Sequence, residues 1–515
     1  MKTSPSAASA GLVRALGPLM AIAIVVGTVI GSGVFKKPQE VAFNVPYFGL
    51  AALAWILGGV LALLGSLALA EVAVLYPRAG GNYVYLREAY GRLAGFLWGW
   101  VDFWIIRGAS LAALATVFAE SLHDVLKNDA FQQALGMELP YLGYWELKWL
   151  TVAVIMGLAV VNVRGVRWGG GLQLFITIVK VGSLLGIMVL PFVAASLVGA
   201  QAATPQVERL DPWWPASLGE FSLGKFVTAL LGVLWAYHGW MNIAPVAEEV
   251  HTPQRNIPFA LIGGTLIIIA LYLGVNLAYY LIVPRLEMAA LKDTTVATHF
   301  SLLLLGPIGA AVASAAVMCS VFGALNGNLL VGPRLLYAMG EDRLAPKFLS
   351  AVHPRYHTPA WAILIMAAWA SILVVGGALL IRIPLPVLTL GSLSLDMNVP
   401  KGETLFGVLT NFAMFGAVTF ETSAVASIFV FRWRQPDAER AYRCVGYPLV
   451  PALYVAIMAL VLANMFTYQQ VQALVGIAFI ASGALIYRLA ARPAEIASAP
   501  AESAEPDAEA SEEPM

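Results

Sequence analysis

The sequence predicts an all-α integral membrane protein with twelve membrane-spanning helices. Two observations lead to this fold class. Hydrophobic residues make up 60% of the 515-residue chain and charged residues only 12%, whereas soluble domains average about 45–50% and about 25%. The apolar residues also gather in stretches of about 20, the length that an α-helix needs to cross the hydrocarbon core of a bilayer.

Twelve apolar segments approach or exceed this length. They cover residues 15–42, 48–76, 91–122, 147–163, 171–198, 223–248, 257–283, 306–340, 359–381, 405–431, 449–468 and 470–488. Several of them are long enough to predict tilted or kinked helices. The first segment is too long for the core of a secretory signal, and no small-residue cleavage site follows it.

The distribution of Lys and Arg predicts the orientation of the spans. With the N-terminus inside, roughly 18 of these residues lie on the cytoplasmic side and roughly 10 outside, as the positive-inside rule requires. We therefore expect a cytoplasmic N-terminal segment at 1–14, a transporter domain of twelve spans at 15–488 and a cytoplasmic tail at 489–515. The tail is acidic and rich in Ala, Pro and Ser, so it is predicted to be disordered.

Several functional classes do not fit this sequence. The formal net charge is zero, so no nucleic-acid partner is expected. The two cysteines, Cys319 and Cys444, fall in an apolar span and a basic loop, and neither has the spacing of a metal ligand. No group of nucleophile, base or metal ligands stands out, so we expect neither an enzyme nor a bound cofactor or metal.

Two spans carry helix-breaking sequence in the middle of the membrane. The stretch 27–35 holds Gly27, Gly31 and Gly33, and each glycine costs about 1 kcal/mol relative to alanine in a helix. The second stretch, 235–242, includes Gly239 and is followed by Pro245. Unpaired backbone groups are tolerated at membrane depth only beside protein or a water-filled cavity, so both stretches are candidate cavity walls.

The positions of the two breaks favour a binding site over simple helix packing. Glycines in a span can serve close packing of neighbouring helices. These breaks, however, lie in the first and sixth spans, which correspond if spans 1–5 and 6–10 are two halves related by an inverted repeat. Paired interruptions at matching positions point to a substrate site near the bilayer midplane.

The backbone chemistry of such a site suits a zwitterion. The half-helix that follows Gly31 begins with free amides at the positive end of its dipole, which favours a carboxylate. The half-helices that end at the two breaks present unpaired carbonyls, which favour an ammonium group. An α-amino acid carries both groups, so it is the expected substrate.

Five groups of residues resemble motifs of the amino acid–polyamine–organocation superfamily. They are 27–35, Glu71 with 76–85, 236–240 with 248–258, 322–327 with Arg334, and 442–448. The likeness runs from about residue 12 to 488 and is greatest to L-type amino acid transporters and their bacterial relatives. It implies a leucine-transporter-type fold, with a 5+5 inverted repeat and two additional helices, in the plasma (inner) membrane.

This resemblance assigns the groups that would hold the amino acid. The amides of Gly31, Ser32 and Gly33 would bind its carboxylate. Its amino group would meet the carbonyls of Val29, Trp235, Ala236 and Tyr237. Ile30, Gly239 and Asn326 complete the candidate set together with His238, which stands where relatives usually have a small or acidic residue. An imidazole there would limit the volume beside the substrate and could change its charge near neutral pH.

Lys180 lies within the fifth span, where a charge costs roughly 2.5–3.5 kcal/mol on insertion scales. Sodium-independent relatives carry a lysine at this place, and the resemblance implies that its ammonium replaces a sodium ion. Gly27, Ile30 and Ser320 are the expected partners. The alternative is that Lys180 extends its ammonium to the cytoplasmic surface.

Two further residues and one loop bear on function. Arg107, in the third span, is expected to neutralise Asp102, and the alternative is that it faces a cavity. The loop 120–146 has no cysteine, whereas animal members of the family link there to a glycoprotein, so no such partner is expected here.

These expectations define a sodium-independent amino acid transporter, an exchanger of small or medium neutral amino acids that works by alternating access. Two alternatives remain open at this point. One is a proton-coupled permease for amino acids or polyamines, and the other is an amino acid sensor that does not transport.

Overall fold

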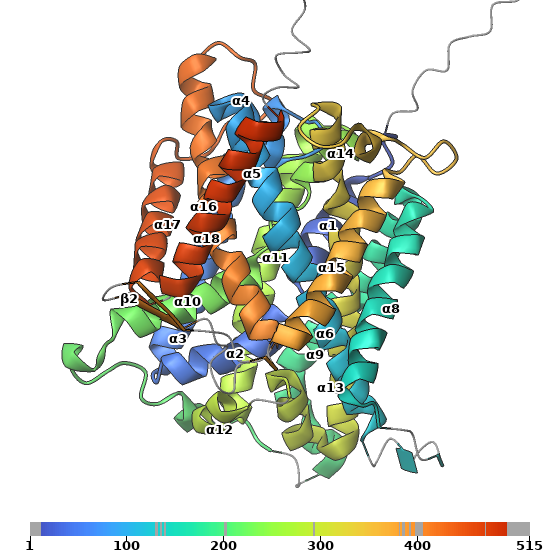
Figure 1. The fold of residues 1–515 in the computed structure, drawn as a ribbon. Coiled ribbons are helices and arrows are strands. Elements are labelled where there is room, and N and C mark those ends of the chain that lie inside the picture. The colour runs from blue at the N-terminus through green and yellow to red at the C-terminus, as the bar shows by residue number, and fades with distance from the viewer. Residues whose placement is uncertain are drawn as a thin grey trace, which may run out of the picture.

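A computed structural model describes the fold as a helical bundle (Figure 1). The residues that it describes are 12–128, 132–133, 136–137, 141–199, 203–291, 294–380, 382–383, 387–390, 393–396, 405–468 and 470–491. Most of the expected N-terminal segment (1–11) and of the expected tail (492–515) lies outside them. The described chain begins and ends at the end of the bundle where α4 and α14 lie (Figure 1).

Each of the twelve predicted segments contains an apolar helix in the described chain. Eleven described helices are long and apolar enough to cross a membrane, and the sixth span contains a shorter apolar helix, Leu223–Tyr237. In chain order the elements of the spans are α1 (Pro18–Val29), α2 (Gly33–Asn44), α3 (Phe48–Leu75), α5 (Arg92–Val101), η1 (Asp102–Arg107), α6 (Gly108–Leu126), α8 (Tyr144–Val163), α9 (Val166–Val198), α10 (Leu223–Tyr237), η5 (Ala244–Glu249), α11 (Pro253–Ile282), α13 (Val296–Val331), α14 (Pro333–Glu341), α15 (Ala360–Leu380), α16 (Leu405–Arg434), α17 (Leu449–Tyr468), α18 (Gln470–Ile486) and η7 (Tyr487–Ala491).

The remaining elements are short and connect the spans. They are α4 (Asn82–Tyr90), α12 (Arg285–Ala290), η3 (Val207–Leu210), η4 (Leu218–Glu220), η6 (Lys347–Ser350) and the strands β1 (Val387–Leu390) and β2 (Leu393–Asp396). The two strands pair antiparallel, with Val387 opposite Asp396. This hairpin is a small addition to the predicted all-α class.

Both predicted helix breaks are present. Helix α1 ends at Val29 and α2 begins at Gly33, so residues 30–32 separate two half-helices that occupy opposite halves of the bundle (Figure 1). Helix α10 ends at Tyr237, and Gly239 has a φ of 105°. Glycine adopts this left-handed conformation without the steric cost of a Cβ, which explains why the chain turns there.

Three local features differ from the sequence predictions. The third span is not one continuous α-helix, because Asp102–Arg107 form a π-helical segment between α5 and α6. The eighth span begins earlier than expected, at Val296, and kinks at Gly306, whose φ is 68°. Helix α6 extends to Leu126, so Glu120 lies on a helix rather than in an outer loop.

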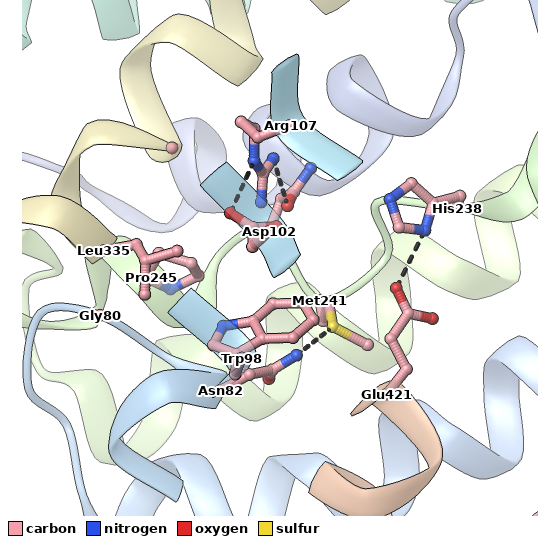
Figure 2. A pocket seen from close by; sticks show the side chains of 12 residues that line it. Gly80, Asn82, Trp98, Asp102, Arg107, His238, Met241, Pro245, Leu335 and Glu421 are labelled. Atoms are coloured by element: carbon pink, nitrogen blue, oxygen red, sulfur yellow. Dashed lines mark hydrogen bonds and ion pairs between the residues drawn. The ribbon is translucent and has the colours of Figure 1, made fainter. Parts of the chain in front are cut away.

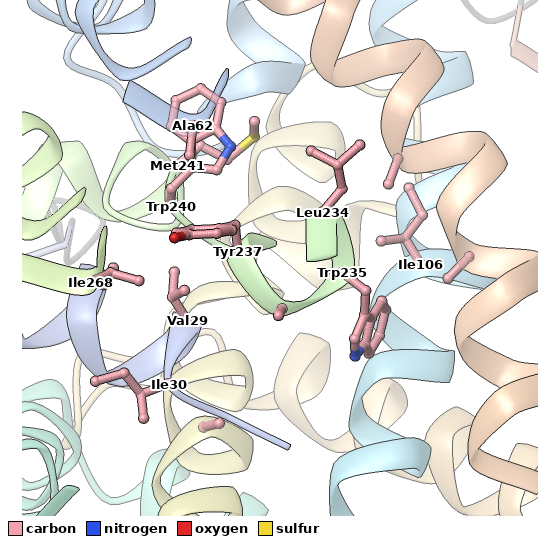
Figure 3. Close-up of a cluster of buried hydrophobic side chains, with 14 of the residues drawn as sticks. Val29, Ile30, Ala62, Ile106, Leu234, Trp235, Tyr237, Trp240, Met241 and Ile268 are labelled. Atoms are coloured by element: carbon pink, nitrogen blue, oxygen red, sulfur yellow. The ribbon is translucent and has the colours of Figure 1, made fainter. Parts of the chain in front are cut away.

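The broken helices lie within the bundle. Helix α1 packs against α9, α11 and α13, and α10 packs against α2 and α3. A buried apolar cluster surrounds both breaks, with Val29 and Ile30 on one and Trp235 and Tyr237 on the other (Figure 3). Large apolar side chains are meanwhile exposed on other helices, for example Phe192, which is 69% exposed on α9. Exposed apolar side chains of this kind fit contact with lipid.

Candidate substrate site

The two breaks meet at a small cavity of about 30 Å³. Its lining comes from both broken spans and from α6 and α13. The lining residues are Thr28, Val29, Gly31, Ser32, Gly33, Ser110, Leu114, Trp235, His238, Gly239, Asn242 and Asn328. Seven of the eleven candidate substrate-binding residues are among them. The space is sufficient for one or two waters, so a larger occupant requires the walls to move apart.

The α2 side of this cavity offers hydrogen-bond donors. The Gly31 amide, which was expected to bind the carboxylate, is not free, because it donates to the Val29 carbonyl at 2.7 Å. The amides of Phe35 and Lys36 bond to the Ser32 carbonyl, whereas those of Ser32, Gly33 and Val34 make no backbone hydrogen bond within the described chain. The hydroxyls of Ser32 and Ser110 are buried and have no partner among the described groups. Buried polar groups are nearly always paired in native proteins, and a helix N-terminus favours an anion. This wall is therefore suited to a carboxylate.

The two glycines of this wall differ in what surrounds them. A Cβ at Gly33 would lie 2.5 Å from the Cα of Ala236, so only glycine permits α2 to approach α10 this closely. A Cβ at Gly31 would lie 3.2 Å from the Cδ2 of Leu114, the end of a flexible side chain. Gly33 is thus required by backbone packing, whereas a side chain at Gly31 would have to displace only the flexible end of Leu114.

The carbonyl side is arranged differently from the sequence expectation. Four carbonyls were expected to be free for an amino group, but three accept hydrogen bonds from the protein. The Tyr272 hydroxyl, on α11, lies 2.9 Å from the Val29 oxygen and 3.0 Å from the Ala236 oxygen. The Trp235 carbonyl accepts from the His238 amide at 3.1 Å. Of these four carbonyls, only that of Tyr237 accepts no hydrogen bond, from backbone or side chain, within the described part of the chain.

Tyr272 thereby joins the two breaks. Its ring is 5.1 Å from that of Tyr237 and 5.8 Å from that of Trp55, measured between centroids. Sequence reasoning did not single out Tyr272, because one tyrosine in an apolar span has no local pattern that indicates which way its hydroxyl points. Its position makes it a competitor for the carbonyls that an ammonium group would use.

Lys180 occupies the place expected of an ion substitute. It is 1% exposed, and its Nζ donates to the Gly27 carbonyl at 2.6 Å and to the Ile30 carbonyl at 2.7 Å. Ser320 Oγ donates to the same Ile30 oxygen at 3.1 Å. The ammonium therefore ties α9 to the end of α1, and it does not extend to the surface.

Four candidate residues lie outside the cavity lining, namely Ile30, Ala236, Tyr237 and Asn326. The reason is clearest for Asn326, whose side chain is fully buried between helices. Its Oδ1 accepts from Asn162 at 2.9 Å, and its Nδ2 donates to Gln173 at 3.1 Å. Asn326 thus makes interhelical hydrogen bonds, and Asn328 instead faces the cavity.

A cluster of ionisable side chains adjoins the cavity (Figure 2). Arg107 Nε lies 3.5 Å from Asp102 Oδ2, as expected, and Arg107 Nη1 donates to Asn328 at 2.7 Å. His238 Nδ1 lies 2.9 Å from Glu421 Oε1, on α16. The sequence contained a signal for Glu421 that the predictions did not use, because an acidic residue inside an apolar span is by default a functional candidate.

Ion pairs close one end of the bundle, the end predicted to be cytoplasmic. Arg334 and Glu249 form a fully buried pair at 2.8 Å between α14 and η5. Arg432 and Arg440 both contact the buried carboxylate of Glu71, at 2.7 and 3.1 Å. Breaking a buried pair leaves an uncompensated charge and is strongly unfavourable, so these contacts hold that end of the bundle shut.

The fold and the cavity together define a class of protein. A bundle of membrane-spanning helices in which two are interrupted around an internal polar cavity is characteristic of secondary membrane transporters. Comparison with known proteins is more specific. The family model described as "Amino acid permease" matches residues 16–489. The chain therefore belongs to the amino acid permease family, and it is a transporter of amino acids rather than an enzyme.

Similar proteins come from bacteria and animals. The serine/threonine exchanger SteT of Bacillus subtilis is 32% identical over 87% of this chain and 90% of its own length. The human b(0,+)-type amino acid transporter 1 is 30% identical over 93% of this chain and 88% of its own. The human cystine/glutamate transporter is 29% identical over 88% and 80%, respectively.

Proposed function

We propose that this transporter is a sodium-independent exchanger of small or medium neutral amino acids, and that it works by alternating access. The Lys180 ammonium carries the first part of the proposal. It bonds to the carbonyls of Gly27 and Ile30, at 2.6 and 2.7 Å, where the sequence predicted that it would replace a sodium ion. Because a fixed cation is bonded to these carbonyls, no sodium ion is needed there.

The exchange mechanism is supported by the relatives. The serine/threonine exchanger SteT is similar over most of both chains and is named for exchange of two small hydroxyl amino acids. In this proposal the substrate carboxylate binds to the amides and hydroxyl of 32–34. The amino group takes the Tyr237 carbonyl and displaces the Tyr272 hydroxyl from those of Val29 and Ala236.

The preference for small or medium side chains follows from His238. Its ring stacks on that of Trp235, with 5.9 Å between centroids and 9° between planes. Both rings line the cavity, so together they restrict the space beside the break. A change of a methylene in such a pocket alters binding by about 1–3 kcal/mol, which is enough to rank substrates by size.

The arrangement in the cell is also proposed. Both termini are cytoplasmic, the protein lies in a plasma (inner) membrane, and it functions without a disulfide-linked glycoprotein subunit. The 5+5 inverted repeat accounts for the placement of one break in the first span and one in the sixth. A second candidate is proton-coupled transport, and the observation that favours it is the group of ionisable side chains that lines the neighbouring cavity.

Uptake into proteoliposomes tests the proposal. A panel of labelled amino acids is offered to purified protein in choline buffer, with and without unlabelled amino acid inside. We expect uptake of small and medium neutral amino acids only when the lumen contains exchangeable amino acid. Equal uptake into empty liposomes would contradict exchange, and a requirement for sodium would contradict the role of Lys180.

A further inference from the structure

Four ionisable side chains, in two pairs, line one cavity beside the substrate cavity. They are Asp102 and Arg107 on the π-helical segment η1, His238 in the sixth-span break and Glu421 on α16 (Figure 2). Asp102 is 1% exposed and Glu421 is 6% exposed. His238 lines the substrate cavity and also the two neighbouring cavities, so it connects the cluster to the place where an amino acid would bind.

The surroundings of this cluster contribute no further charge. In the described chain, the only acidic or basic side chains that line the three cavities are those four. Tyr237 on α10 and Tyr454 on α17 are the other titratable groups, and both face Glu421 and His238 in one of the cavities. The elements α3 and α14 contribute apolar residues there, such as Leu61 and Leu335.

Counting charges in this cluster leaves one positive charge missing. Asp102 and Glu421 carry two negative charges when ionised, and Arg107, which stays protonated in proteins, carries one positive charge. An uncompensated charge at membrane depth is expensive. Histidine is the side chain that most readily gains a proton between pH 5 and 8, and His238 Nδ1 lies 2.9 Å from Glu421 Oε1. One proton on this pair makes the cluster neutral.

The ammonium group of an amino acid would supply positive charge at the same place, while its carboxylate would lie apart from the cluster, at the amides that begin α2. The ammonium group would bind at the carbonyls that end α10, and the residue that follows this helix end is His238. A protonated imidazole and an ammonium at adjacent positions repel each other. In a buried environment that repulsion is weakly screened. Proton and ammonium are therefore alternative ways to balance the two carboxylates.

We propose that the His238–Glu421 pair is a proton-binding site whose proton is expelled when an amino acid binds. On binding, the proton leaves the imidazole for solvent, Glu421 stays ionised, and the substrate ammonium compensates the cluster. This inference rests on the proposed function only in requiring that an amino acid occupies the cavity. Because linkage is reciprocal, amino acid affinity falls as the pH is lowered through the titration of the pair, by up to tenfold per pH unit.

Calorimetry on the full-length purified protein tests this directly. The amino acid found active in the uptake panel is titrated in two buffers of different ionisation enthalpy, at several pH values. The buffer dependence of the heat gives the number of protons released. We expect release of up to one proton at acid pH and progressively less release as the pH is raised, because a site that holds no proton has none to expel.

Variants separate the pair from other ionisable groups. In Glu421→Gln and in His238→Asn, proton release disappears and the affinity becomes independent of pH. The matched control is Glu287→Gln, which removes a second histidine–glutamate contact, that of His299 at 3.4 Å, outside these cavities. This control keeps the wild-type proton release. Using both cluster variants keeps the test valid if one of them does not fold.

Each outcome has a separate meaning. Amino acid binding without proton release, or with proton uptake, overturns the proposed proton site and leaves amino acid transport intact. Release that persists in both cluster variants also overturns it, because another group must then titrate. If no amino acid of the panel binds or is transported by the wild type, the proposed function itself fails.

Discussion

Replacing Lys180 by alanine removes the contact on which sodium-independent transport depends in this account. The Lys180 ammonium donates to two backbone carbonyls, and within the described chain it is the only side-chain donor to that of Gly27. The Ile30 carbonyl keeps the Ser320 hydroxyl at 3.1 Å. In the variant, the end of α1 therefore loses its link to α9, and the Gly27 carbonyl loses its bonded cation.

The size of the effect follows from these two bonds. A hydrogen bond to a charged group contributes about 1.5–3 kcal/mol. If the transporter loses one of the two bonds when it changes state, Lys180→Ala alters that equilibrium by about 1.5–3 kcal/mol, or roughly 10- to 150-fold. We expect transport to fall at least tenfold. Amino acid affinity should change much less, because the ammonium does not line the cavity.

The assay compares initial uptake in proteoliposomes with equilibrium binding, in sodium and in choline buffer. Lys148→Ala is a matched control, because Lys148 is also buried and its ammonium lies over the Tyr144 ring, 5.1 Å from the centroid, rather than at a helix break. Lys180→Met retains most of the volume and tests the charge alone. Normal uptake by Lys180→Ala and Lys180→Met, or a steep sodium requirement in the wild type, would refute the reasoning.

Four further predictions concern the site and the topology. Gly31→Leu fills the cavity while only displacing the flexible Leu114, so it should abolish amino acid binding with a normal elution profile; unchanged affinity would argue against the site. His238→Gly should admit larger amino acids, and an unaltered rank order of substrates would contradict this. Tyr272→Phe frees the carbonyls of Val29 and Ala236 and should tighten amino acid binding about fivefold, since one hydrogen bond has a net value of about 1 kcal/mol. Weaker binding would mean that the hydroxyl assists the substrate. Tyr141 lies in the loop 120–146, which the predicted orientation places outside the cell. Tyr141→Cys, in a variant without native cysteines, should therefore react with an impermeant thiol reagent added outside cells, and labelling only from the cytoplasm would contradict the predicted topology.

Of the two native cysteines, Cys444 would give little background in such an experiment even if it were retained. Cys319 and Cys444 are both free thiols. Cys444 lies in the segment before α17, and burial, with a further contribution from the charge of Glu71, raises the pKa of its thiol to about 11. The reactive species of a thiol is the thiolate, so Cys444 reacts slowly at neutral pH.

The spans and their breaks were predictable because both depend on local sequence. Length and apolar content fixed the twelve segments, and glycines within them marked where the helices stop. Gly239 is an example, because its φ of 105° is a backbone conformation that glycine adopts without the steric cost of a Cβ. Lys180 was equally visible, because a charged residue far inside a span is costly unless it has a dedicated partner.

The residues that were missed depend on tertiary structure. Tyr272 bonds to Val29 and Ala236 from a different helix, 243 and 36 residues away in sequence. The π-helical segment of the third span adds a residue to one turn. This segment contains no glycine or proline that would have indicated it in the sequence. The placement of Asp102 and Arg107 therefore could not be derived from a regular helical period. Asn326 shows the converse, because a polar residue near the right level of the membrane points away from the cavity.

Counterflow in sodium-free proteoliposomes tests the central claim most directly. Liposomes containing the wild-type protein are loaded with a high concentration of an unlabelled neutral amino acid and diluted into choline buffer with a trace of the labelled form. The account predicts transient accumulation of label inside, its dependence on the internal amino acid, and no accumulation with Gly31→Leu. Absence of counterflow until sodium is added would contradict sodium-independent exchange through the site at the two helix breaks.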